Sequence, residues 1–131
     1  MPESPVRELR LAYTVEYYHG AVRFYRDVLG LPVIQEWEQP TGSGAILDAG
    51  RATLELLSVD QSELVDRIEV GEVVSGPIRL ALEVEDSEET ANALVAAGAQ
   101  RIGGPVVTPW SHKNVRLHSP DGMQLTLFTV L

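Results

Sequence analysis

The sequence predicts an α+β fold built from two tandem βαβββ modules. Two observations support this fold class. A strand pattern followed by a helix pattern occurs twice in the same order, and three further short strand patterns follow each copy. The 131 residues are enough for a single domain with one substantial core, which we place at 1–131. Within it we expect module one at 8–58, a connector at 59–76 and module two at 77–131.

Module one is predicted to begin with a half-buried strand at 8–15, where apolar residues alternate with polar or small ones. Residues 17–29 then change to helical spacing, and Gly30 follows where a left-handed C-cap belongs. We expect the apolar stripe of this helix to pack on the sheet; it consists of Ala21, Phe24, Tyr25, Val28 and Leu29. Glycine-rich turns separate three further strands, predicted at 32–37, 45–49 and 52–58.

Module two repeats this order. Residues 78–84 alternate as a strand, and Asp86 with Glu89 three residues later predicts a capping box. The helical stripe that follows contains Ala91, Leu94 and Val95, and Gly98 closes it. Three strands are predicted at 100–107, 113–118 and 123–130, with a Ser-Pro-Asp-Gly turn at 119–122. We expect a short helix at 61–68 in the connector, and hairpin turns at Gly42, Gly44, Gly103 and Gly104.

Composition excludes several classes of function. Nineteen acidic and ten basic residues give a formal net charge of −9, and such a surface repels nucleic acids and anionic membranes. The chain has no cysteine, which rules out disulfides, thiolate zinc sites and a cysteine nucleophile. The first residues lack the apolar core of a signal peptide, and no apolar run reaches membrane-spanning length. We therefore expect a cytoplasmic protein that has neither nucleic acid nor a membrane as its partner.

Three segments occur in order along the chain: FYRDVLGLPV at 24–33, TLELL at 53–57 and SPDGMQLTLF at 119–128. They resemble signature segments of the vicinal oxygen chelate superfamily, which includes glyoxalase I, extradiol dioxygenases and bleomycin-resistance proteins. The resemblance implies that the sheet of each module curls, and that two modules form an open barrel around a ligand cleft. It also implies a homodimer, in which the modules that line one cleft come from one chain or from two.

The resemblance also indicates where a metal would bind. Metal-dependent members carry His or Gln on the first strand of each module and Glu near the last strand. Counting along the matching segments, these positions are occupied here by Arg10, Glu55, Arg79 and Thr126. A guanidinium group has no free lone pair to offer a metal, so Glu55 is the only remaining family ligand. We expect no cofactor; a divalent metal would need shifted ligands such as Glu55 with His112 or His118.

The strand period places Arg10 and Arg79 on the cleft side of equivalent strands. Three interpretations of these arginines and Glu55 follow. They form an ion network that fills the former metal site, they form a cationic spot that binds a carboxylate, phosphate or enolate oxygen, or they are exposed to solvent.

Aromatic residues are further candidates for the cleft. Trp37 at the end of a strand and Trp110 in an overhanging loop are predicted ligand-stacking walls, although either also fits a core or a dimer interface. Phe128 is expected on the cavity floor beside Thr126, and His112 near the ligand. We expect His19 to be exposed, and His118, which precedes the Pro-Asp-Gly turn, is a weaker candidate for ligand contact than His112.

Three classes of function follow. The first is a metal-free small-molecule binding protein, for example one that sequesters or senses an antibiotic or a toxic metabolite. The second is a lyase, isomerase or dioxygenase-type enzyme with a non-standard metal site or with arginines that stabilise an enolate. The third is a structural module whose cavity is filled by its own side chains.

Overall fold

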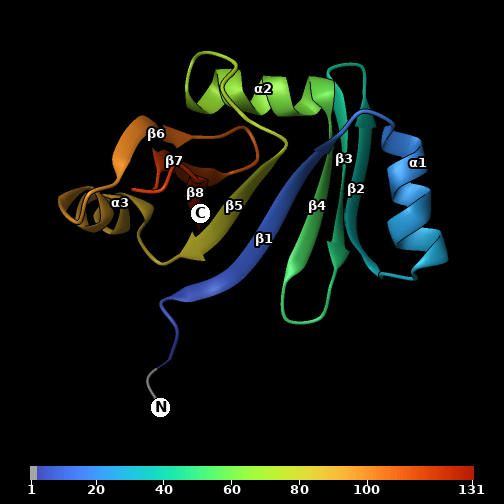
Figure 1. Cartoon of the computed structure of the whole chain (residues 1–131), viewed down its shortest axis with the longest axis horizontal. Coiled ribbons are helices and arrows are strands. Elements are labelled where there is room, and N and C mark those ends of the chain that lie inside the picture. Colours follow the sequence, from blue (N-terminus) through green and yellow to red (C-terminus); the bar gives the residue numbers. More distant parts are fainter. Residues whose placement is uncertain (1–2) are drawn as a thin grey trace.

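The computed structural model describes residues 3–131, which form one eight-stranded sheet with helices packed against it (Figure 1). Residues 1 and 2, which the predicted domain includes, lie outside the described part. In module one the order of elements is β1 (Val6–Val15), α1 (Tyr18–Val22), a π-helix η1 (Arg23–Val28), β2 (Val33–Gln39), β3 (Gly42–Asp48) and β4 (Thr53–Ser58). The connector contains α2 (Val59–Glu69), close to the short helix predicted at 61–68.

Module two repeats the pattern with β5 (Ile78–Val84), α3 (Ser87–Ala96), β6 (Gln100–Val107), β7 (His112–His118) and β8 (Gln124–Val130). One of the two hydrogen bonds of the predicted capping box is present, because the Glu89 backbone N–H donates to the Asp86 Oδ1 at 3.1 Å. The α+β fold class is therefore confirmed, and the strand bounds agree with the predictions to within three residues.

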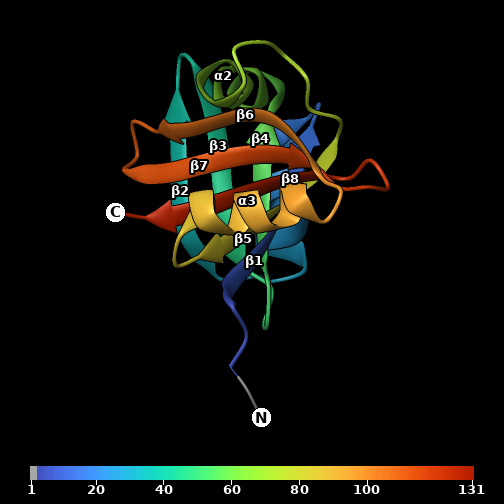
Figure 2. The same ribbon diagram turned by 90° about the vertical axis from the view of Figure 1, so that its left-hand side faces the viewer.

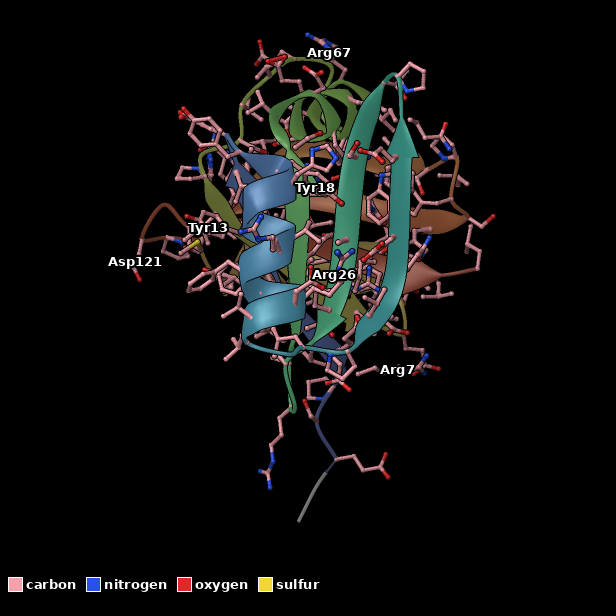
Figure 3. All side chains as sticks on the ribbon, turned by 90° about the vertical axis from the view of Figure 1, so that its right-hand side faces the viewer. Arg7, Tyr13, Tyr18, Arg26, Arg67 and Asp121 are labelled. Carbon is pink, nitrogen blue, oxygen red and sulfur yellow. The ribbon has the colours of Figure 1, made fainter. Side chains whose placement is uncertain are left out.

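The strands are arranged in the order β2-β3-β4-β1-β5-β8-β7-β6. The two central strands, β1 and β5, are antiparallel, and each lies parallel to the last strand of its own module. The sheet curls without closing. Figure 2 shows α3 on the outer face of the module-two strands, and Figure 3 shows α1 on the outer face of module one.

Each module buries its core between the outer helix and the sheet. In module one Val22 of the helix packs with Ala45, Leu47 and Leu56, and in module two Ala91 packs with a corresponding set. Since side chains alternate along a strand, the residues between these core positions point to the inner, concave face. Ile46, Glu55 and Leu57 are such residues, and this alternation assigns them to the site described below.

The predicted packing of the first helix is wrong for three residues. Phe24, Val28 and Leu29 are exposed, whereas Val22 is buried and Tyr25 packs against the core. The helix changes to π geometry at Arg23, and the Leu29 N–H bonds to the Phe24 carbonyl five residues earlier at 2.9 Å. This wider turn rotates the later side chains away from the stripe that a regular helix would form.

The prediction of hairpin turns at four glycines is also wrong. Gly42 and Gly44 lie in β3, and Gly103 and Gly104 lie in β6. A Cβ at Gly42 would clash with the backbone of Gln61 at the start of α2, and one at Gly103 would clash with the backbone of Glu69 at its end. The two glycines therefore let α2 rest on one strand from each module.

We expect Gly103→Ala to lower the free energy of unfolding by about 1–3 kcal/mol, because the new methyl group meets backbone atoms that cannot move independently. Urea unfolding measures the change. The matched control is Gly76→Ala, since nothing lies within 4 Å of the place that a Cβ would occupy there. Equal stability of the two variants would contradict the close seating of α2.

None of the helices in residues 3–131 has the length and apolar character needed to cross a bilayer.

Candidate functional site

A cavity of about 610 Å³ lies on the inner face of the curled sheet, with α2 along one side. Figure 1 shows α2 across one end of the sheet, next to strands of both modules. One chain supplies residues from both modules to this cavity. All eight residues predicted from the sequence line it: Arg10, Trp37, Glu55, Arg79, Trp110, His112, Thr126 and Phe128. A cavity of this size contradicts the alternative in which the protein's own side chains fill the cleft, and it falls within the usual range for ligand pockets.

The strand register relates the central polar residues by an internal two-fold pattern. Arg10 on β1 pairs with Ala81 on β5, and Arg79 on β5 pairs with Ala12 on β1. Ala12 also pairs with Glu55 on β4, and Ala81 also pairs with Thr126 on β8. Arg10 is thus the counterpart of Arg79, and Glu55 the counterpart of Thr126.

Arg79 is a buried cation on the cavity wall. Only 7% of the residue is exposed, and its Nη1 donates a 2.8 Å hydrogen bond to the Thr126 Oγ1. It forms no ion pair within residues 3–131. Burial lowers the pKa of the Arg79 guanidinium, and the nearby charge of Arg116 lowers it further. A buried guanidinium with free N–H donors favours an anionic partner in the cavity.

Arg10 has a different environment. Its Nε forms an ion pair with Glu8, and its guanidinium carbon lies 4.9 Å from the centre of the Phe128 ring. The His112 ring is stacked on the same phenyl ring, with centroids 5.0 Å apart. Burial and the charge of Arg10 lower the pKa of His112, so its imidazole is neutral at pH 7. Phe128 therefore lines the cavity, and its ring contacts the side chains of both Arg10 and His112.

Glu55 is half-buried at the cavity wall. Burial raises the pKa of its carboxyl group, and the charges of Arg79 and Arg10 only partly oppose this shift. No ion pair within residues 3–131 joins Glu55 to either arginine. The predicted Arg10–Glu55–Arg79 ion network is therefore wrong, because Arg10 turns to Glu8 and Arg79 turns to Thr126. The solvent-exposed alternative is also wrong for Arg79.

The sequence analysis missed a buried ion network beside this wall. Arg116 on β7 is fully buried and bonds to Asp66 at 2.9 Å and Glu69 at 2.8 Å, both on α2. Burial opposes ionisation of Asp66, but hydrogen bonds from Ser75 and Arg116 outweigh it and lower the pKa of its carboxyl group. This network fixes the end of α2 to the sheet.

Glu69 also holds Asn114, another cavity residue that the sequence analysis missed. The Asn114 Nδ2 donates to the Glu69 Oε2 at 2.8 Å, which fixes the orientation of the amide. Sequence pattern alone gives no signal for Asn114 or Arg116, because their partners lie 45 and 50 residues away.

Trp37 is oriented by two contacts. Its Nε1 donates a 3.0 Å hydrogen bond to the Gln61 Oε1 on α2, and its ring covers the space where Gly44 has no side chain. Trp37 and Gly44 are direct cross-strand partners. Trp110 follows β6 at the edge of the cavity and remains 39% exposed.

The remaining histidines lie away from the cavity lining. His19 is exposed, as predicted, and pairs with Glu38, while His118 ends β7.

The central residues do not fit a divalent metal. Two of the four superfamily positions carry guanidinium groups, and neither a guanidinium nor the Thr126 hydroxyl is a usual ligand for such an ion. Over residues 3–131 no group of three or more His, Cys, Asp or Glu side chains is placed to hold a metal ion. Glu55 alone remains at a superfamily ligand position.

Several solved structures have the same fold. A methylmalonyl-CoA epimerase from Mycobacterium tuberculosis is 18% identical, covering 100% of this chain and 93% of that one, with a TM-score of 0.70. A hypothetical protein from Bacillus halodurans C-125 is 22% identical, covering 93% and 92%, with a TM-score of 0.68. The Streptomyces coelicolor methylmalonyl-CoA epimerase in complex with 2-nitronate-propionyl-CoA is 21% identical, covering 97% and 99%, with a TM-score of 0.67.

No curated protein sequence shows a significant match to this chain. The model of the Glyoxalase/Bleomycin resistance protein/Dioxygenase superfamily matches residues 9–127, which include both modules and the connector. The chain belongs to the Glyoxalase/Bleomycin resistance protein/Dioxygenase superfamily.

Proposed function

We propose that this protein is a metal-free small-molecule binding protein that recognises an anionic group in the cavity. The observation that carries the proposal is Arg79, which is buried on the cavity wall without an ion-pair partner in residues 3–131. A carboxylate or phosphate on the ligand would supply the missing counter-charge and accept the free N–H groups. Sequestration of an antibiotic or a toxic metabolite is one role that such a binder would fill.

The test uses protein purified without chelators or an affinity tag. Benzoate should raise the melting temperature, since a ligand that binds only the native state stabilises it, whereas uncharged benzamide should not. Elemental analysis of the same sample should find no stoichiometric divalent metal. Equal effects of benzoate and benzamide would contradict anion recognition, and a stoichiometric metal would contradict the metal-free part.

Glu55 should make binding of the anion depend on pH. Its pKa lies above the usual 4.5, so its negative charge develops as pH rises above that value and opposes an anion at Arg79. We expect Glu55→Gln to flatten the decline of benzoate affinity as pH rises above 4.5, and to bind benzoate more tightly than the wild type wherever Glu55 is ionised. Calorimetric titration at several pH values measures both effects.

The folding stability of the wild type should also fall as pH rises and Glu55 ionises. Because the pKa of Glu55 is higher in the folded protein than in the unfolded chain, its contribution to folding stability is fully present below the unfolded pKa. This contribution is lost as pH rises through the folded pKa. Glu55→Gln should therefore gain stability relative to the wild type over the pH range above 4.5 in which the folded Glu55 carboxyl group ionises. A constant difference across this range would contradict the raised pKa.

A second candidate function is proton transfer at a carbon next to a carbonyl group. It is favoured by Glu55, a carboxylate of raised pKa that is not ion-paired within residues 3–131 and lies on the same cavity wall as Arg79. The C–H proton would pass to the Glu55 carboxylate, and the electron pair would become an enolate whose oxygen faces Arg79. Incubation with methylmalonyl-CoA in D₂O should then exchange the proton, and Glu55→Gln should abolish the exchange; no exchange by the wild type would eliminate this candidate.

A homodimer and a cytoplasmic location are also part of the proposal. The exposed Phe24, Val28 and Leu29 give the first helix an apolar surface suited to a second copy. We expect Val28→Glu to convert a dimer to a monomer in light scattering coupled to size-exclusion chromatography. A monomeric wild type at micromolar concentration would contradict this assembly.

A further inference from the structure

One face of α2 gives the cavity an apolar side. Leu64, Val65 and Ile68 recur at helical spacing and all line the cavity, whereas Asp60 and Arg67 of the same helix face outward and are exposed. Leu64 and Ile68 remain only partly buried. In a globular protein, partly exposed aliphatic side chains inside a concave site favour contact with an apolar ligand group.

This helix is held in position at both ends. The Ser58 side chain caps its start by accepting from the Gln61 N–H at 3.2 Å, and Gly42 allows the close approach of β3 there. At the other end, Arg116 holds Asp66 and Glu69. The apolar face of α2 is therefore part of a preformed wall, and a ligand gains its contact without ordering the helix.

Module one extends the apolar side, since Ile46, Leu57 and the oriented Trp37 line the same cavity. Arg10, Glu55, Arg79 and Thr126 line the cavity from the central strands β1, β4, β5 and β8. The charged residue that α2 itself contributes to the lining, Glu69, is buried and already bound by Arg116 and Asn114. The lining thus has a polar region around Arg79 and an apolar region formed by Leu64, Val65 and Ile68 of α2.

We propose that the ligand is an amphiphilic acid, with one anionic head at Arg79 and an apolar body against Leu64, Val65 and Ile68. This inference rests on the proposed function and adds the chemical class of the ligand. The affinity for a series of acids should then increase with the apolar area of the body, because burial of that area on α2 contributes the additional free energy.

The test compares acetate, benzoate and 2-naphthoate in calorimetric titrations, with acetate measured by competition and 2-naphthamide as the uncharged control. We expect 2-naphthoate to bind at least about tenfold more tightly than acetate, since it buries far more apolar surface. We also expect 2-naphthoate to bind more tightly than 2-naphthamide. Equal affinities for the three acids would overturn the amphiphile inference alone, whereas equal affinities for acid and amide would overturn the proposed anion site.

Two variants locate the apolar body. Leu64→Gln should lower the affinity for 2-naphthoate at least fivefold and leave the affinity for acetate unchanged, because only the larger acid reaches α2. The matched control is Val59→Gln, which places the same side chain on the exposed start of α2 outside the cavity lining. If Leu64→Gln does not fold, Ile68→Gln replaces it. An unchanged affinity for 2-naphthoate in a folded variant, or equal losses for both acids, would overturn the assignment.

Discussion

Replacing Arg79 by methionine should weaken benzoate binding by about 10- to 100-fold, the range expected for losing charge-assisted hydrogen bonds in a buried site. The stability should stay the same or rise, because the variant removes a buried cation that has no ion-pair partner in residues 3–131. Calorimetry and urea unfolding of the same samples measure the two effects. Opposite changes in binding and stability would separate a ligand-binding residue from a structural one.

Arg67→Met is the control for this experiment, since it makes the same change of charge on the outer side of α2 (Figure 3). It should leave both affinity and stability nearly unchanged, because the Arg67 side chain is 61% exposed and lies 3.6 Å from Glu63 in a surface pair. A large loss of stability in Arg79→Met with unchanged benzoate affinity would show that Arg79 serves the fold alone.

The largest loss of stability is expected for Arg116→Leu, at about 3–5 kcal/mol. The substitution leaves the carboxylates of Asp66 and Glu69 buried without their cationic partner. Hydrogen bonds hold the pKa of Asp66 below its usual value, so ionised Asp66 stabilises the native state above pH 3.8 and this contribution disappears as pH falls through its folded pKa. Part of the difference between wild type and variant should therefore disappear in acid.

Urea unfolding at pH 7 and at pH 3 tests this prediction. Arg67→Leu provides the comparison with an exposed ion pair and should cost less than about 1 kcal/mol. A loss for Arg116→Leu as small as that of the control would contradict the view that α2 is anchored by buried charges.

The sequence predicts the fold and the central positions of the cavity because both depend on local period and repetition. Alternation along β1 and β5 places Arg10 and Arg79 on one face, and the repeated module makes Glu55 and Thr126 equivalent. Because successive residues of a strand point to opposite faces of the sheet, the sequence of one strand is enough to assign each residue to a face. The neighbouring strands need not be known.

Other features depend on contacts between distant segments. Gly42 and Gly103 resemble turn residues in the sequence, yet they lie in strands and accommodate the two ends of α2. The π geometry at Arg23–Val28 has no counterpart in the regular apolar stripe, so the exposure of Phe24 could not be read from its spacing. Arg116 lies in an ordinary strand pattern and gains its role only from α2.

The cavity as a site for an acid is tested most directly by a crystal structure of the protein with 2-naphthoate. The carboxylate should lie within hydrogen-bonding distance of the Arg79 guanidinium, with the rings against Leu64 and Ile68 of α2. A ligand bound outside the cavity, a carboxylate that faces away from Arg79, or an empty cavity at saturating 2-naphthoate would each contradict the account.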